Sequence, residues 1–261
     1  MAQGNPEMDG LKGKVAIVTG ASAPLGIGRA IARRLAQAGA SVFCVAEATP
    51  KQLDEVVQEC REFPDAGDIQ AELIDLGVAG EPERMVQLAE QRFGRIDVLV
   101  NNAGVRMPVD FGDYTRAQFD RVMSVNLASA FFASQAVLPA MRRQGGGRII
   151  HIASQLGHVT YRQRALYGMT KAAMIHLTKS MAYELGRENI IVNAISPGPI
   201  ATGPTLVRPP DVTRQRVQQY IPCGRLGEPE EVADLAFYLA SSSPAFLQGQ
   251  DIVVDGGYII H

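Results

Sequence analysis

Three residues in the second half of the chain have the types and spacing of a proton-transfer site. Ser154 stands at the end of a predicted strand, and Tyr167 and Lys171 lie four residues apart in a predicted helix. That spacing puts the tyrosine and the lysine on one helical face. Because an ammonium group favours the phenolate form of a nearby tyrosine, we expect Tyr167 to exchange a proton near neutral pH. Ser154 would bind a substrate carbonyl or hydroxyl. Such tyrosine–lysine pairs also occur on ordinary helices, so the pair alone does not define an active site.

A glycine-rich turn at residues 19–28 has the features of a phosphate-binding loop. It follows a predicted strand and leads into a predicted helix. Its glycines allow the backbone to approach a pyrophosphate, and the helix N-terminus supplies free N–H groups. Glu47 follows the next strand, where a carboxylate would accept hydrogen bonds from ribose hydroxyls and repel a 2′-phosphate. The alternatives are a plain strand–helix turn and a solvated surface glutamate.

Short apolar strands alternate with amphipathic helices along the chain. This alternation predicts a parallel sheet with helices on both faces, in one domain over residues 1–261. We expect residues 1–10 to be flexible and residues 200–220, which overlap a proline-rich stretch, to form a substrate lid. The predicted strands are 14–19, 41–46, 69–74, 96–101, 148–153, 190–195 and 251–254, and the predicted helices are 27–38, 51–62, 83–93, 114–143, 165–186 and 229–241.

Composition excludes several classes of protein. The 261 residues include 25 Lys and Arg against 27 Asp and Glu, and 46% are hydrophobic, as in a folded globular chain. The near-zero net charge gives no reason to expect a nucleic acid or a membrane surface as a partner. The cysteines and histidines lack metal-ligand spacing, so no metal site is expected. With no leader and no long apolar run, we expect a cytoplasmic protein.

Further short motifs occur in the order and spacing of one known family. Each is weak alone, but together they make the chain resemble the classical short-chain dehydrogenase/reductase family over about residues 11–258. Besides the 19–28 turn and Ser154, the motifs are Asp75-Leu76, Asn101-Asn102-Ala103-Gly104, Asn126, Tyr167-Gly168-Met169-Thr170-Lys171, Pro197-Gly198-Pro199-Ile200-Ala201-Thr202 and Val254-Asp255-Gly256-Gly257.

The resemblance implies an α/β fold with a Rossmann-type, doubly wound parallel sheet of about seven strands. It also implies a catalytic tetrad of Asn126, Ser154, Tyr167 and Lys171. The tyrosine would be the general acid and base, and the lysine would lower its pKa and hold the nicotinamide ribose. The serine would orient the reacting oxygen, and the asparagine would hold a water that links the lysine to solvent.

The resemblance further implies hydride transfer between a nicotinamide cofactor and a secondary alcohol or ketone, in a homotetramer. The cofactor would be NAD, with NADP less favoured. Within the expected cofactor contacts, Asp75 and Leu76 would meet adenine, and Ile200 and Thr202 would meet the carboxamide. The full set is Gly20, Ser22, Gly26, Ile27, Gly28, Glu47, Asp75, Leu76, Asn102, Ala103, Gly104, Tyr167, Lys171, Pro197, Gly198, Ile200 and Thr202.

Two positions depart from the family pattern. Five residues separate Gly20 from Gly26, where the family usually has three, and Pro24 among them has no N–H to offer a phosphate. NAD-preferring members commonly carry aspartate at the position of Ala46. The acidic residue here is Glu47, one place later, which still favours NAD.

The segment between Ser154 and the tyrosine helix is expected to border the substrate. Its polar residues Gln155, His158, Arg162 and Arg164, with Arg106 and Arg208 from other loops, could form a cationic mouth for a sugar, cyclic polyol or anionic substrate. The alternative is that these arginines are ordinary surface residues.

Two other functions remain open. A 3-oxoacyl-thioester reductase would favour NADP and a basic docking patch. A non-catalytic nucleotide-binding scaffold could share the fold, because a fold does not fix a function. The complete tetrad disfavours the scaffold, which has no need of all four residues.

Overall fold

The computed structural model describes residues 10–206 and 210–260. Seven parallel strands form one sheet in the order β3-β2-β1-β4-β5-β6-β7, which confirms the predicted doubly wound α/β domain. The strands are β1 (Val15–Thr19), β2 (Ser41–Ala46), β3 (Ile69–Leu73), β4 (Val98–Asn101), β5 (Gly147–Ile152), β6 (Ile190–Pro197) and β7 (Asp251–Val254).

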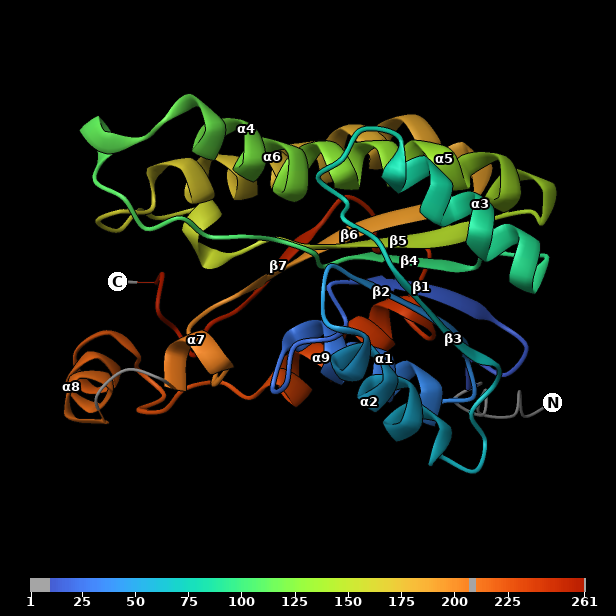
Figure 1. The fold of residues 1–261 in the computed structure, drawn as a ribbon, viewed down its shortest axis with the longest axis horizontal. Helices are drawn as coiled ribbons and strands as arrows, with labels where there is room; N and C mark the ends of the chain where they lie inside the picture. The colour runs from blue at the N-terminus through green and yellow to red at the C-terminus, as the bar shows by residue number, and fades with distance from the viewer. Residues whose placement is uncertain (1–9, 207–209, 261) are drawn as a thin grey trace, which may run out of the picture.

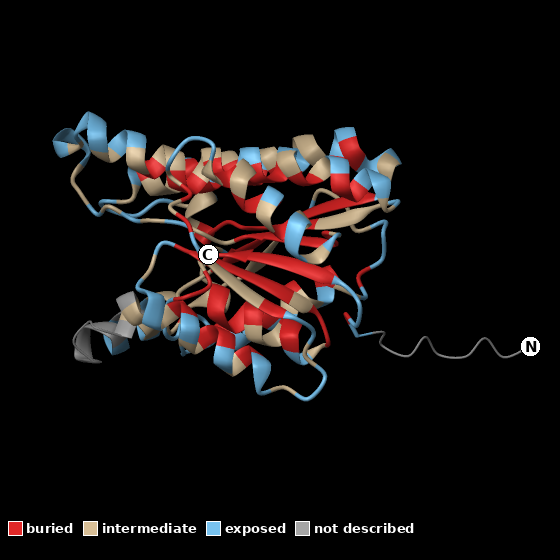
Figure 2. Ribbon diagram, turned by 45° about the vertical axis from the view of Figure 1, so that its right-hand side comes forward, coloured by how far each residue is buried: buried red, intermediate tan, exposed pale blue. Residues whose placement is uncertain are grey.

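Helices cover both faces of the sheet (Figure 1). One layer contains α1 (Ile27–Gln37), α2 (Pro50–Arg61) and α9 (Pro229–Ala240), and the other contains α3 (Glu81–Phe93), α4 (Arg116–Met123), α5 (Ser129–Arg143) and α6 (Ala165–Leu185). The central strands are mostly apolar because both of their faces are covered. Every residue of β1 and β6 is buried, as the red strands in Figure 2 illustrate.

Alternate residues of the central strands pack into two separate hydrophobic cores, one on each face of the sheet. On β1, Ile17 packs with the α3, α5 and α6 layer, whereas Ala16 and Val18 pack with the α1, α2 and α9 layer. This alternation follows from the two-residue period of a strand. Two rigid cores therefore hold the carboxyl ends of the strands in place.

The predicted helix over residues 114–143 is interrupted. Five residues, Ser124–Ala128, form a π-helical turn between α4 and α5. By length and composition the run Arg116–Arg143 is apolar enough to cross a membrane, with a mean hydropathy of 1.3. In this fold 44% of its apolar window is buried, and α5 packs against α3 and the sheet, as expected of a core helix.

The predicted lid contains two helices that the sequence pattern did not reveal. They are α7 (Gly203–Leu206) and α8 (Pro210–Tyr220). The segment is pinned at its base, where Ile200 bridges to Gly227 and the Gly227 N–H donates to the Pro199 carbonyl at 3.0 Å. Arg208 and residues 1–9 lie outside the described residues, and closure of the lid stays a prediction.

Candidate active site

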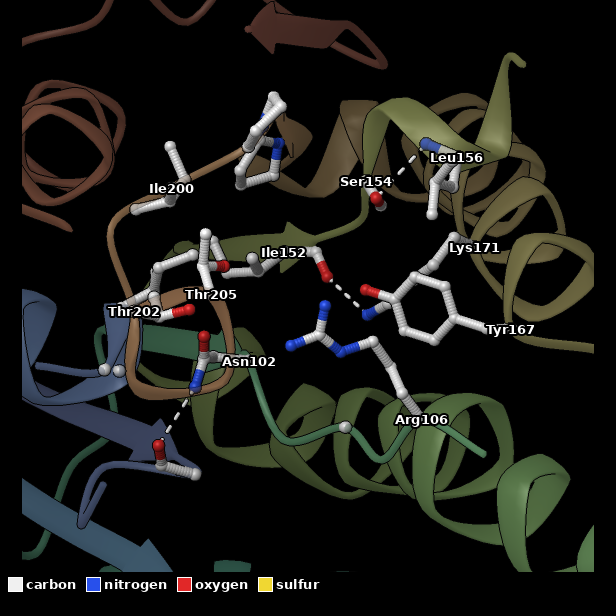
Figure 3. Close-up of a pocket in the computed structure, with 18 of the residues that line it drawn as sticks. Asn102, Arg106, Ile152, Ser154, Leu156, Tyr167, Lys171, Ile200, Thr202 and Thr205 are labelled. Atoms are coloured by element: carbon white, nitrogen blue, oxygen red, sulfur yellow. Dashed lines mark hydrogen bonds between the residues drawn. The ribbon is translucent and has the colours of Figure 1, made fainter. Parts of the chain in front are cut away.

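A cavity of about 480 Å³ lies at the carboxyl ends of the strands. It runs from the glycine-rich turn after β1 to Ser154, Tyr167 and Lys171, with α8 contributing part of its wall. The order of strands reverses between β1 and β4, and such switch points are where open α/β sheets bind ligands. Figure 3 shows the end of this cavity that holds the tyrosine.

Thr19 and Asn102 lock the glycine-rich turn to β4. The Thr19 hydroxyl accepts hydrogen bonds from the Asn102 and Ala103 N–H groups at 2.9 and 3.0 Å. The Asn102 side chain in turn donates to the Thr19 and Gly20 carbonyls at 2.8 and 3.1 Å. A Cβ at Gly28 would lie 2.3 Å from the Gly20 oxygen, so this position requires glycine. The turn is thus built by protein contacts alone.

The two extra residues of this turn are accommodated by a tight turn of the backbone at residues 23–26. Leu25 adopts a left-handed conformation with φ of 56°, and the Gly26 N–H donates to the Ala23 carbonyl at 2.9 Å. Arg29 supports the turn from behind by donating to the Ser22 carbonyl at 3.4 Å while pairing with Glu59 at 2.6 Å. Ser22 and Gly26 line the cavity, as the sequence predicts, and Pro24 lines it as well.

A three-residue ion network lies behind the far end of the cavity, where only Glu47 of the three lines the wall. Glu47 lines the wall and pairs with Arg121 of α4. The same guanidinium donates to both oxygens of Asp75, at 2.7 and 2.8 Å. The sequence predictions did not include Arg121, because nothing in the periodicity of a long helix marks one arginine as facing a strand end.

This network changes the expected adenine contacts. The Asp75 carboxylate is engaged by Arg121 and by the Gly77 N–H at 2.9 Å, and Leu76 is buried in the core beneath. Neither residue is part of the cavity wall. All the other predicted cofactor residues line it, including Pro197, Gly198, Ile200 and Thr202.

Ser154, Tyr167 and Lys171 converge at the other end, on the strand end and helix that the sequence predicts. The Lys171 ammonium is buried and donates to the Ile152 carbonyl at 2.7 Å, and it lies 5.7 Å from the centre of the Tyr167 ring. The Ser154 hydroxyl accepts from the Leu156 N–H at 3.2 Å (Figure 3). All three side chains border the cavity.

The charge that acts on Tyr167 differs from the expected one. Burial raises the pKa of Tyr167, whereas Arg106, a hydrogen bond with Ser154, and Arg164 oppose that rise. Burial, and to a lesser extent the charge of Arg106, together lower the pKa of Lys171 to about 8. Among the cations that lower the pKa of Tyr167, Arg106 has the largest effect, and the expected effect of Lys171 on the tyrosine stays a prediction.

Asn126 is fully buried in the π-helical turn. Its side-chain oxygen accepts from the Val105 N–H at 2.8 Å, and its amide donates to the Val105 carbonyl at 3.0 Å and to the Thr170 hydroxyl at 3.2 Å. It therefore clamps the loop after β4 and touches the tyrosine helix. The water relay to Lys171 stays a prediction.

The structure separates the four predicted substrate residues into two pairs. Gln155 and Arg164 line the cavity. His158 instead faces Asp251 of β7, at 2.5 Å, and Arg162 pairs with Asp110 at 3.2 Å on the surface. Neither His158 nor Arg162 borders the cavity, so the predicted cationic mouth is wrong for these two residues. The carboxylates that hold them lie far away in sequence, which is why local reasoning misplaced them.

The remaining wall comes from residues that sequence patterns did not single out. Among the described residues, no group of His, Cys, Asp and Glu is arranged to hold a metal ion. The additional wall residues include Ala23, Val105, Leu156, Tyr161, Thr205, Val217, Tyr220, Ile221, Leu226 and Tyr258. Several belong to the lid segment, whose aromatic and apolar side chains have no regular period.

Comparisons with known proteins agree with this geometry. Residues 20–259 match a family model described as enoyl-(acyl carrier protein) reductase. A 3-oxoacyl-[acyl-carrier-protein] reductase from Thermotoga maritima is 36% identical, over 96% of this chain and 99% of its own. A 7α-hydroxysteroid dehydrogenase from Escherichia coli is 38% identical over 95% and 94%, and a 2-dehydro-3-deoxy-D-gluconate 5-dehydrogenase from Dickeya dadantii is 36% identical over 95% and 96%.

Solved structures of relatives contain both forms of the nicotinamide cofactor. A 7α-hydroxysteroid dehydrogenase in complex with NADH and 7-oxo glycochenodeoxycholic acid superposes with a TM-score of 0.90, at 36% identity over 99% of both chains. An Agrobacterium tumefaciens protein with bound NADP, a candidate 2-deoxy-D-gluconate 3-dehydrogenase, gives 0.86 at 34% identity over 97% and 98%. The chain therefore belongs to the classical short-chain dehydrogenase/reductase family, as an NAD(P)-dependent oxidoreductase that acts on alcohols or ketones.

Proposed function

We propose that this protein interconverts a polar secondary alcohol and its ketone, with Tyr167 transferring the proton and NAD as the preferred cofactor. The observation that carries the proposal is the meeting of Ser154, Tyr167 and Lys171 at one end of a cavity whose other end is a preformed phosphate turn. A carbonyl oxygen held by Ser154 would lie next to the tyrosine hydroxyl.

The residues present fit a dinucleotide. Gly20 and Asn102 approach Gly28 closely, and Gly26, Ile27 and Gly28 line the cavity at the N-terminus of α1, where a pyrophosphate is favourably bound. The nicotinamide would lie against Ile200 and Thr202, with Lys171 at its ribose. When bound, the nicotinamide supplies or accepts the hydride.

Proton transfer is the part of the reaction that the chain itself performs. In reduction the Tyr167 hydroxyl gives its proton to the substrate oxygen, and in oxidation the phenolate takes it back. Lys171, with a pKa of about 8, is the neighbouring buried group that can change charge closest to neutral pH. Asn126, through Val105 and Thr170, keeps the surrounding loop and helix in position.

The proposed preference for NAD rests on the charge around Glu47. Glu47 and Asp75 bring two carboxylates to one guanidinium, that of Arg121, so the network carries a net negative charge. A 2′-phosphate there would meet repulsion, while ribose hydroxyls could donate to the carboxylate.

The test is a turnover assay with NAD and NADP in parallel, on hydroxy acids, sugars, polyols and 3-oxoacyl thioesters. We expect Tyr167→Phe to lower turnover by about 10²–10⁴-fold, since only the proton-carrying hydroxyl is removed. The dissociation constant of NADH, followed by its fluorescence, should stay near the wild-type value. Near wild-type turnover in the variant would remove Tyr167 from the mechanism, and cofactor binding without turnover of any substrate would favour the scaffold.

A further inference from the structure

We propose that Arg106 binds a carboxylate of the substrate and that Gln155 accepts a hydrogen bond from one of its hydroxyls, so that the substrate is a hydroxy acid or the corresponding oxo acid. This inference rests on the proposed function and narrows it to one substrate class.

Arg106 places a cation directly in front of the reacting groups. Its side chain extends from the loop after β4 into the cavity, toward Tyr167 and Lys171 (Figure 3). Within the described part of the chain it forms no ion pair or hydrogen bond, whereas Arg121 and Arg162 each meet a carboxylate. An arginine fork without a protein partner suits a ligand carboxylate, which it can bind through two parallel hydrogen bonds.

The charges of the cavity wall favour an anion at this end. Arg106, Arg164 and Lys171 all border the reacting end. The one carboxylate among the described wall residues is Glu47, which lies at the opposite end and is paired with Arg121. A substrate carboxylate near Tyr167 therefore meets attraction, with no acidic wall residue beside it.

The backbone next to Arg106 is fixed by hydrogen bonds. Asn126 binds both the N–H and the carbonyl of the adjoining Val105, at 2.8 and 3.0 Å, and Asn126 is itself fully buried. The base of the arginine side chain is thus fixed by the same π-helical turn that touches the tyrosine helix. This anchoring limits the entropy lost when the guanidinium binds an anion.

Gln155 is a second observation, independent of Arg106, that points to a bound ligand. The residue is only 6% exposed and lines the cavity, yet its side-chain oxygen is buried without a hydrogen-bond partner. Gly198 lies against this oxygen, since a Cβ built on Gly198 would come within 2.9 Å of it. Leaving a buried acceptor unpaired costs about 1–3 kcal/mol, so a bound donor is favoured. A hydroxyl can donate to it, whereas an ionised carboxylate cannot.

The experiment measures binding with matched pairs of probes. Lactate, 3-hydroxybutyrate and D-gluconate are compared with lactamide, 3-hydroxybutyramide and D-glucitol, which lack the charge. Their dissociation constants are measured by calorimetry on the protein saturated with NAD. Turnover of the same probes is recorded separately, so that a failed reaction and a failed carboxylate preference are distinguishable.

We expect at least one acid to bind about 10- to 100-fold more tightly than its neutral partner, the range of a hydrogen bond to a charged group. Arg106→Met should abolish that preference, and Arg106→Lys should restore part of it because the charge returns without the fork. Arg162→Met is the matched control, because this arginine is outside the cavity, and it should keep the preference.

Gln155→Leu should weaken binding of D-gluconate and D-glucitol alike while leaving the dissociation constant of NADH unchanged. If NADH binding weakens instead, Gln155 serves the cofactor and that half of the proposal is wrong. Equal binding of every acid and its neutral partner in the wild type, or equal behaviour of Arg106→Met and Arg162→Met, would overturn the carboxylate assignment, whatever the turnover.

Discussion

Arg121 changes what Glu47 does at the cofactor end of the cavity. A lone glutamate would repel a 2′-phosphate, but this one shares a guanidinium with Asp75. Removing the charge of Glu47 would leave Arg121 already in place, close to where the phosphate would lie. The residue that we propose opposes NADP and an arginine that could bind its 2′-phosphate are therefore neighbours.

Glu47→Gln should consequently shift the preference toward NADP without an added arginine. We expect the ratio of kcat/KM for NADP over NAD to rise at least tenfold, because a repulsive carboxylate is lost and part of the Arg121 charge is freed. Glu47→Gln combined with Arg121→Met should lose most of this gain. If the wild type already prefers NADP, or the ratio is the same in both variants, Arg121 has no part in cofactor choice.

Residue types and spacing were enough to place Ser154, Tyr167 and Lys171 in one site, because a strand end and one helical face fix their positions. They were not enough for His158 and Arg162, whose partners Asp251 and Asp110 are 93 and 52 residues away in the sequence. The raised pKa of Tyr167 could not be predicted either, because the spacing of residues does not show how deeply a side chain is buried. Ion pairs between residues far apart in the chain, and the effect of burial on a pKa, cannot be predicted from a single sequence.

At the scale of elements, the tyrosine helix α6 and the short helix η3 (Gln155–Gly157) touch through glycines. A Cβ at Gly168 would lie 2.8 Å from the Leu156 carbonyl oxygen, and one at Gly157 would meet Ile175 at 2.7 Å. Leu156 also donates its N–H to Ser154. The distance between these two helices therefore sets the position of Ser154 relative to Tyr167.

Gly168→Ala should separate the two helices and lower kcat by roughly ten- to a hundredfold, as small misplacements of reacting groups do. The KM for NAD should change little, because the phosphate turn lies elsewhere. Gly112→Ala is the control, since no atom lies within 4 Å of its added Cβ. Equal kcat values for the two variants would show that this contact does not position the serine.

The apolar runs and their spacing predicted all seven strands, and the central strands β1, β4 and β6 are fully buried. Periodicity missed the π-helical turn Ser124–Ala128, since one wider turn hardly changes the pattern of a long helix. It also missed α8, which begins at the end of the proline-rich stretch and has few apolar residues to mark a buried face.

At the scale of the whole molecule, the outer face of α5 and α6 carries exposed aromatic rings. Phe131 and Phe132 are 46% and 42% exposed and pack edge to face at 5.3 Å, and Tyr183 on α6 is 92% exposed. Exposed aromatic residues are typical of protein–protein interfaces. We propose that this face contributes to the homotetramer that the family resemblance implies.

Light scattering at micromolar concentration should accordingly give the mass of four 28.1 kDa chains. Phe131→Glu together with Phe132→Glu should reduce that mass, because two carboxylates would be buried unpaired in the interface. Phe111→Glu, at another exposed aromatic residue, should leave it unchanged. A wild-type mass of a single chain would refute the tetramer.

The bridge between Ile200 and Gly227 separates changes in substrate range from changes in the rest of the fold. Because the segment leaves and rejoins the body at one hydrogen-bonded neck, its length and sequence can change while the sheet and the phosphate turn keep their contacts. The part of the cavity wall that this segment contributes can therefore change independently of the rest of the fold. New substrate ranges can then be acquired by replacing this one stretch of chain, without rebuilding the machinery for hydride and proton transfer.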